Sequence, residues 1–435
     1  MQILRGNAAT NPLTTTLAGL QWLFFMFANV VVIPISVGNA FHLPPAVITA
    51  SLEHAFIYTG LACLLQVLIG HHFPFMEGPA GLWWGYILSV AGSATATGQS
   101  LVEVGGSLET GILMAGVLVM LIGLLGIGWW LRRLFTPVVN STFYFLLGVQ
   151  LCAVFFKGMI GLSNSTVIQL PIALFSFVLV ILVMFISIRG RGALSNLALL
   201  IGIVVGWIAF RLLFPAQTSV LAPAGGAFFA LFPWGNLAWN IGIITATVLA
   251  GLMSMSNTYA TLEGVEPLFH EVVTPPMYRR SLLITGFSSI VSGLLGLVPY
   301  APYTSSLGFL RATRIYDRLP FLLASILFIL LGVIPVLGQL FASLPVSVGD
   351  AVLFVAYLQL FGAGLNAIDG LKFSFKTIYR LALPVLFGIT LMTIPATAFS
   401  TLPAIVRPLL QNGLVMGILL AIILEQVVRW DKLAS

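Results

Sequence analysis

The sequence has few charged residues and almost no cysteine. Of its 435 residues, 7% are Asp, Glu, Lys or Arg and 59% are hydrophobic, and the mean hydropathy is +1.09. This composition excludes a soluble globular domain and indicates an integral membrane protein. Cys63 and Cys152 both lie in apolar segments, where cysteine is usually a small packing residue, so we expect no disulfide framework.

Signatures of soluble enzymes are missing as well. The sequence has no phosphate-binding Gly-Lys loop, no paired metal-ligand spacing and no nucleophile elbow. We therefore expect no enzyme activity, no metal site and no cofactor.

Long apolar runs fill most of the chain. A helix needs about 20 apolar residues to cross the hydrocarbon of a bilayer. By this criterion, fourteen candidate spans begin near Thr14, Pro44, Met76, Leu108, Pro137, Val167, Ser195, Asn240, Ser281, Pro302, Leu319, Val346, Thr377 and Pro403. Gly-rich stretches such as Gly123 to Gly128 indicate close packing between these helices.

The basic residues predict how the spans are oriented. If the N-terminus is cytoplasmic, all of the 18 Lys and Arg residues except Lys157, Arg211 and Arg407 lie on the cytoplasmic side. This asymmetry follows the positive-inside rule and favours an even number of spans. We therefore expect a multi-pass protein of the bacterial inner membrane with both termini cytoplasmic. The net charge of +6 thus reflects topology and does not indicate a nucleic-acid partner.

Two of the spans are interrupted by residues that disfavour a regular helix. The interruptions are His71 to Gly81 and Val298 to Ser306. Irregular backbone is tolerated inside a bilayer only beside a cavity or buried in protein. The centres of the breaks, Ala80 and Thr304, are 224 residues apart (304 − 80), close to half of the chain. Fourteen spans divide into two sets of seven. Because seven is odd, the second set crosses the membrane in the opposite sense to the first, so we predict an inverted repeat of the kind found in secondary transporters.

The first break carries a candidate carboxylate. Glu53 and Glu77 are the two acidic residues set well into apolar sequence, whereas Glu103 and Glu109 are expected in an outer loop. An intramembrane carboxylate is costly and is a functional candidate by default. Within the break, Glu77 directly precedes Gly78-Pro79-Ala80-Gly81, so it could bind a polar ligand, take up a proton, or cap the half-helix that follows.

Other groups of the first break could contact a flat ligand. Trp83 and Trp84 could stack on a planar ring or belong to a membrane-interface belt. Backbone groups freed by the break could form hydrogen bonds with a ring edge. The substrate-binding candidates here are Glu77, Gly78, Ala80, Gly81, Leu82 and Trp83.

The second break and the eighth span add polar candidates. Hydroxyl-bearing residues flanked by prolines favour a binding site over hydrogen bonds within one helix. In the eighth span, Asn257 and Thr261 are four residues apart and therefore lie on one helix face. Interhelical hydrogen bonding is the alternative role there. The candidates are Tyr303, Thr304, Ser305, Ser306, Ser256 and Asn257.

At these residues the sequence resembles the nucleobase-ascorbate transporter family, also called nucleobase:cation symporter-2, and within it a branch of purine permeases. The segment from Ser305 to Arg314 keeps Gly308, Thr313 and Arg314 of the family signature and has serine at its first two positions. Met76-Glu77-Gly78 and the Gly19-Leu20-Gln21 start of the first span also resemble the family.

The resemblance implies an all-α polytopic fold of fourteen spans in a 7+7 inverted repeat, with short β-strands in the broken spans three and ten. A core domain would comprise residues 14–135 and 240–343, and a gate domain residues 136–215 and 344–430. The substrate would lie between the two strands beside span eight, with Gln21 in a supporting position. The family's span-eight glutamate corresponds to Ser256 or Asn257, and a ligand-facing position in span ten corresponds to Ser305.

Serine or asparagine at these two positions, in span eight and span ten, cannot take up a proton. Three mechanisms of coupling are therefore open. Glu77 could have taken over protonation, transport could be uncoupled, or another cation could be used. We prefer the first, because Glu77 is the carboxylate adjacent to the expected site.

The expected function is alternating-access transport of a purine-type base such as xanthine, urate, guanine or hypoxanthine, coupled to H⁺ or another cation. The alternatives are a uracil or pyrimidine permease, an anion transporter of the sulfate-carrier type that uses the half-helix N-termini, and a membrane sensor or scaffold that binds without translocating. Related transporters often dimerise through the gate, so a homodimer is a further expectation.

Overall fold

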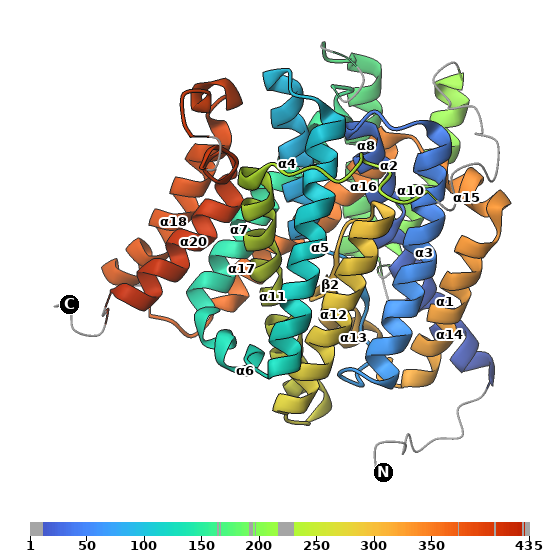
Figure 1. Ribbon diagram of the computed structural model, residues 1–435. Coiled ribbons are helices and arrows are strands. Elements are labelled where there is room, and N and C mark those ends of the chain that lie inside the picture. The colour runs from blue at the N-terminus through green and yellow to red at the C-terminus, as the bar shows by residue number, and fades with distance from the viewer. Residues whose placement is uncertain are drawn as a thin grey trace.

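A computed structural model describes residues 12–162, 165, 167–190, 195, 197–215, 230–372, 374–403, 406–428 and 430. These residues form a bundle of helices with a pair of short strands near its centre (Figure 1). Four of the basic residues used to orient the chain, Arg5, Arg191, Arg429 and Lys432, lie outside the described residues.

The first half of the chain contains nine described α-helices and one strand. They are α1 Pro12–Val30, α2 Val32–Ala40, α3 Pro45–Leu68, β1 Glu77–Pro79, α4 Gly81–Thr97, α5 Leu101–Leu125, α6 Gly128–Leu131, α7 Pro137–Met159, α8 Leu170–Arg189 and α10 Ala198–Leu213. The second half continues with α11 Ile241–Phe269, α12 Pro275–Leu295, β2 Tyr300–Pro302, α13 Ser305–Thr313, α14 Arg318–Val333, α15 Pro335–Ala342, α16 Val346–Tyr357, α17 Gln359–Ala367, α18 Phe375–Thr393, α19 Arg407–Leu410 and α20 Gly413–Val427.

Polar caps and prolines start several of these helices. The hydroxyl of Thr136 accepts a hydrogen bond from the Val139 peptide N–H at 3.4 Å, and Pro137 occupies the first position of α7. The side-chain oxygen of Asn240 accepts from Ile243 at the start of α11 in the same way. Such caps satisfy N–H groups that a helix start leaves without partners.

The number of long apolar helices is lower than the number of predicted spans. In the part of the chain that the structure describes, eight helices are long and apolar enough to cross a membrane, or nine if α14 and α15, bent by 85°, form one span. α10 and α20 are apolar but shorter, and α13 has nine residues because a strand takes up part of its span. Helix length and composition therefore support a multi-pass protein, but they do not account for all fourteen predicted spans.

Two predicted boundaries are wrong, and one of them changes the environment of a carboxylate. α5 begins at Leu101 and not near Leu108, so Glu109 lies inside the helix and is fully buried, not in an outer loop. Its Oε1 accepts a hydrogen bond from the Trp234 peptide N–H at 3.1 Å. The last span begins at Gly413, ten residues after Pro403 (413 − 403), and the short helix α19 precedes it.

The helices form two packed groups. In the first group, α12 and α11 contact α5, α14 contacts α3 and α1, and α13 contacts α11. In the second group, α16, α17, α18 and α20 contact α7, and α8 and α10 pack against α16. In Figure 1, α18 and α20 lie on the left and α1 and α14 on the right. Contacts of α4 with α7 and of α2 with α16 join the groups.

Glycine permits a close contact between α5 and α12 in the first group, as the Gly-rich segment predicts. A Cβ atom on Gly123 of α5 would lie 2.9 Å from the Leu283 backbone nitrogen of α12. A Cβ atom on Gly286 of α12 would lie 2.5 Å from the Met120 backbone nitrogen of α5. Both distances are too short for a side chain, so these backbones meet directly.

We expect Gly286→Ala to lower the melting temperature of the purified protein. The added methyl must push α5 and α12 apart, at a cost of about 1–3 kcal/mol in the free energy of unfolding. The matched control is Gly92→Ala in α4, where a Cβ would meet no atom within 4 Å. That change should raise stability slightly, because alanine favours helix more than glycine does. Equal melting temperatures for the two variants would contradict the close contact.

Candidate functional site

The two sequence breaks meet at the centre of the bundle as a pair of antiparallel strands. In β1 and β2, Glu77 is opposite Pro302, Gly78 opposite Ala301 and Pro79 opposite Tyr300. Two further backbone bonds of 2.8 Å, from Ala80 to the Pro299 carbonyl and from Tyr303 to the Met76 carbonyl, extend the pairing. The strands satisfy most of the peptide groups that the breaks release, as burial inside a membrane protein requires.

A helix begins directly after each strand. α4 starts at Gly81 and α13 at Ser305, and no side chain caps either start. The first N–H groups of an uncapped helix have no intrahelical acceptor and carry a partial positive charge. At α13, however, the Ser306 N–H donates to the Tyr303 carbonyl and the Leu307 N–H to the Thr304 carbonyl, both at 3.0 Å. The strand pair therefore places the donors at the start of α4 beside the start of α13.

The hydroxyl of Thr304 connects three helices at this point. Its Oγ1 lies 3.1 Å from the Thr261 hydroxyl of α11 and accepts a bond of 3.4 Å from the Tyr144 hydroxyl of α7. The Ser306 hydroxyl is used within the break, where it accepts from the Met76 N–H at 3.1 Å. Of the two hydroxyls, Thr304 therefore faces the neighbouring helices, and Ser306 holds the strand pair.

α11 presents a row of polar groups beside the strands. Ser254, Ser256 and Thr258 are buried, and their hydroxyls have no partner within the described residues. The Asn257 amide is only half-buried and makes one long bond, 3.4 Å, to the Ser254 carbonyl. Because Asn257 is one helical turn from Thr261, its amide lies on the face that contacts Thr304.

One face of α13 is open. Ser305, Gly308 and Arg311 are exposed, and a Cβ on Gly308 would meet no atom within 4 Å. These positions are three residues apart and share a face. α13 leads to the end of the bundle where α1 begins, because Gly19 of α1 packs on the first turns of α14. The second break therefore continues into a helix that has an exposed face and leads to that end of the bundle.

The second group of helices covers the start of α4. A Cβ on Gly81 would lie 3.4 Å from the Tyr357 ring of α16 and 3.5 Å from Leu147 of α7. The Gln150 amide of α7 donates a 2.7 Å bond to the Gly85 carbonyl of α4. Sequence reasoning missed Tyr144, Gln150 and Tyr357. An amide or tyrosine inside an otherwise apolar span was the available signal.

Glu77 points into the first group and not toward Tyr357. Its carboxyl is fully buried, and Oε1 accepts a 2.6 Å bond from the Thr285 hydroxyl of α12. Its Oε2 has no hydrogen-bond partner, and no basic side chain pairs with it in the described residues. Gln66 of α3 donates to the same threonine at 3.3 Å. Since no side chain caps α4, Glu77 does not cap the half-helix.

The remaining predicted residues line the break or pack behind it. Tyr303 donates a 2.5 Å bond from its hydroxyl to the Pro79 carbonyl and so ties the two breaks together. Trp83 and Leu82 are buried, and Trp83 packs against Gly251 of α11. Gln21 lies on α1 and is half-buried, with no hydrogen bond to the other candidates among the described residues.

Comparisons with known proteins agree with this architecture. A family model described as "Permease family" matches residues 13–397. The Bacillus subtilis protein named "Putative purine permease YwdJ" is 29% identical, with 96% of this chain and 97% of the relative covered. The uric acid transporter UacT of Escherichia coli is 25% identical, with 95% and 86% covered.

Solved structures are similar in fold at low identity. The transmembrane domain of the cyanobacterial bicarbonate transporter BicA has a TM-score of 0.60 at 16% identity and covers 94% of this chain and 96% of its own. The murine anion transporter Slc26a9 in the inward-facing state has a TM-score of 0.61 at 10% identity, covering 97% and 68%. With the family model matching most of its length, the chain belongs to the permease family of nucleobase-ascorbate transporters, whose members are transporters and not enzymes.

Proposed function

We propose that the protein is a secondary transporter of purine-type bases, such as xanthine, urate, guanine or hypoxanthine, that works by alternating access in a cell membrane. The observation that carries this proposal is the paired strands with two uncapped helix starts beside the polar row of α11. Relatives named as purine and uric acid permeases support the substrate class.

The base would bind by its edges. Backbone groups of Ala80 to Leu82 and of Thr304 to Ser306 would offer donors and acceptors, except the N–H groups of Ala80 and Ser306, which already have acceptors. Asn257 offers a donor and an acceptor in one amide. Tyr357 covers the start of α4 and would stack on the ring or move aside for it. A neutral heterocycle fits this set because no charged side chain takes part in it.

Movement between the two helix groups would carry the base across. We assign the first group to a core domain, residues 14–135 and 240–343, and the second to a gate domain, residues 136–215 and 344–430. Fourteen spans in an inverted repeat agree with the antiparallel strands. With a cytoplasmic N-terminus, the exposed face of α13 would make this an inward-open state. The bonds Gln150–Gly85 and Tyr144–Thr304 would break as the core moves.

Proton coupling would use Glu77. A buried carboxylate without a basic partner is costly in a membrane interior, and proton uptake removes that cost. Its peptide group lies in β1, so a change at the carboxyl reaches the binding strands directly. Coupling to another cation and uncoupled transport remain the alternatives.

Counterflow in proteoliposomes tests the transport function. We expect internal xanthine to drive uptake of labelled xanthine, and external urate, guanine or hypoxanthine to compete. The anion-transporter alternative has some support, because the solved structures of similar fold include anion transporters. Competition by sulfate but not by purines would favour it, and competition by uracil alone would favour a pyrimidine permease. Binding of xanthine without counterflow would instead identify a sensor or scaffold.

A further inference from the structure

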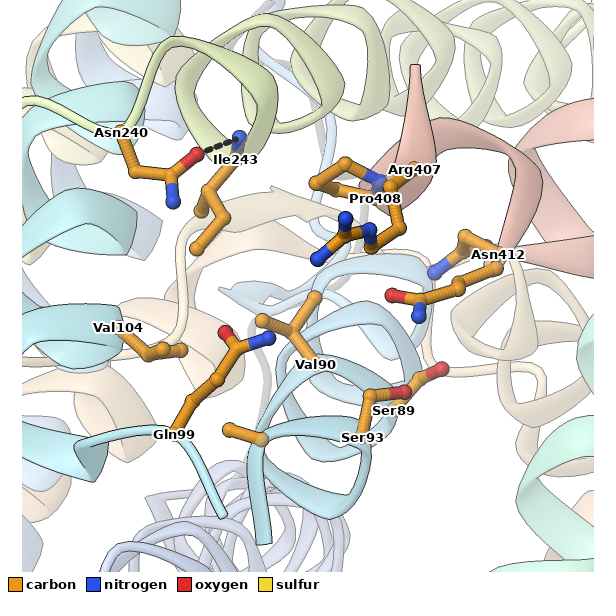
Figure 2. A pocket seen from close by; sticks show the side chains of 12 residues that line it. Ser89, Val90, Ser93, Gln99, Val104, Asn240, Ile243, Arg407, Pro408 and Asn412 are labelled. Atoms are coloured by element: carbon orange, nitrogen blue, oxygen red, sulfur yellow. Dashed lines mark hydrogen bonds between the residues drawn. The ribbon is translucent and has the colours of Figure 1, made fainter. Parts of the chain in front are cut away.

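A second polar site lies at the other end of the bundle from the exposed face of α13. A cavity of about 50 Å³ is bounded by α4, the starts of α5 and α11, and α19 (Figure 2). Its polar lining residues are Ser89, Ser93, Gln99, Arg407, Gln411 and Asn412, together with the α11 cap Asn240, and none of its lining residues is acidic. The lining of the cavity thus carries one positive charge and no negative charge.

Asn412 supplies a buried donor without an acceptor. Its side chain is 2% exposed, and Oδ1 accepts a 3.0 Å bond from the Val415 N–H at the start of α20. This bond fixes the amide, and Nδ2 has no partner among the described residues. A buried donor that lacks an acceptor costs roughly 1–3 kcal/mol, which a ligand in the cavity could recover.

Hydrogen bonds hold the Arg407 side chain in place and leave one of its N–H groups without an acceptor in the described residues. Its Nη2 donates to the carbonyls of Ser400 at 2.6 Å and Leu402 at 2.9 Å, whereas Nε is buried without a partner in the described chain. Figure 2 shows the guanidinium directed toward the middle of the cavity, with Gln99 across from it. Because neutral carbonyls orient this guanidinium, its charge is preorganised and not neutralised.

We propose that this cavity is an entry subsite that binds the deprotonated, oxo-bearing edge of an anionic purine such as the urate monoanion. The proposal rests on the proposed transport function. The cavity has room for roughly four waters, enough for the edge of a base but not for the whole ring system. α4 contacts α5 and α11 of the first helix group. The lining residue Asn412 caps α20, which packs in the second group, so the subsite lies between the two groups and changes as they move. The subsite would thereby favour anionic over neutral purines before the base reaches the strands.

Initial uptake rates in proteoliposomes at neutral pH test the subsite, with labelled urate as the anion and hypoxanthine as the neutral base. Arg407→Gln should raise the urate KM by at least about tenfold, as expected for loss of a hydrogen bond to a charged group, and leave the hypoxanthine KM unchanged. Ser93→Asp adds a negative charge while keeping the carbonyl bonds of Arg407, and should act in the same direction. Ser93→Asn is the control for a neutral change at the same position. Arg211→Gln is the control for removal of a positive charge away from the cavity.

Several results would overturn the subsite. One is an unchanged urate KM in both Arg407→Gln and Ser93→Asp. Another is an equal loss of urate and hypoxanthine uptake in Arg407→Gln with Ser93→Asp unaffected, which assigns Arg407 to holding the adjacent turn. A third is a rise in melting temperature with inorganic phosphate but not with urate, which indicates a general anion site. Wild-type vesicles that take up neither base would count against the transport function itself.

Discussion

Replacing Asn257 by alanine should abolish purine uptake at low substrate concentration without lowering the amount of protein in the membrane. The amide is half-buried and makes one long internal bond, so the fold depends little on it. Loss of two hydrogen bonds to a neutral ring costs about 2 kcal/mol, which corresponds to about a 30-fold rise in the half-saturating concentration. Counterflow of labelled xanthine, with the protein amount determined on the same vesicles, measures this.

Asn366→Ala is the matched control for the asparagine variant. Asn366 is exposed on α17, away from the strands, and its loss should leave uptake at the wild-type level. A wild-type rate in Asn257→Ala would exclude the amide from the binding site. The polar row of α11 would then have an interhelical role, which is the other interpretation of Asn257 and Thr261.

Replacing Glu77 by glutamine should abolish proton-driven accumulation but preserve counterflow exchange. Glutamine keeps an oxygen that can accept the Thr285 hydroxyl, so the contact between β1 and α12 can remain. It cannot take up a proton, so an imposed proton gradient no longer favours movement of the loaded core, and the base distributes at its equilibrium ratio. Vesicles with an inward proton gradient and labelled xanthine measure the accumulation, and an internal pH dye reports proton entry.

Glu53→Gln provides the matched control for Glu77. Glu53 is also buried, on α3, but its carboxyl lies against Gly338 of α15 and not beside the strands. Accumulation should survive in this variant. If accumulation persists in Glu77→Gln as well, Glu77 is not the coupling group. A wild-type protein that responds to sodium and not to protons uses another ion, and one that responds to neither is uncoupled.

Much of the candidate site could be recognised in the sequence because it interrupts a strong pattern. Pro79 and Pro302 end the two strands that the breaks form, and both breaks interrupt long apolar runs. In such a background each polar or helix-breaking residue is conspicuous, since the bilayer penalises it. Tyr144, Gln150 and Tyr357 escaped notice because a single polar or aromatic side chain in a span does not reveal which neighbour it faces.

The sequence by itself determined that the chain is a multi-pass membrane protein with two broken spans, because hydrophobicity and backbone regularity are local properties. Only the tertiary structure decided which way the side chains of those breaks point. Glu77 bonds to a threonine more than 200 residues away in sequence, and the expected loop residue Glu109 is buried beneath Trp234. Such partners depend on how distant helices pack, and the spacing of residues along one chain does not encode that packing in any directly readable form.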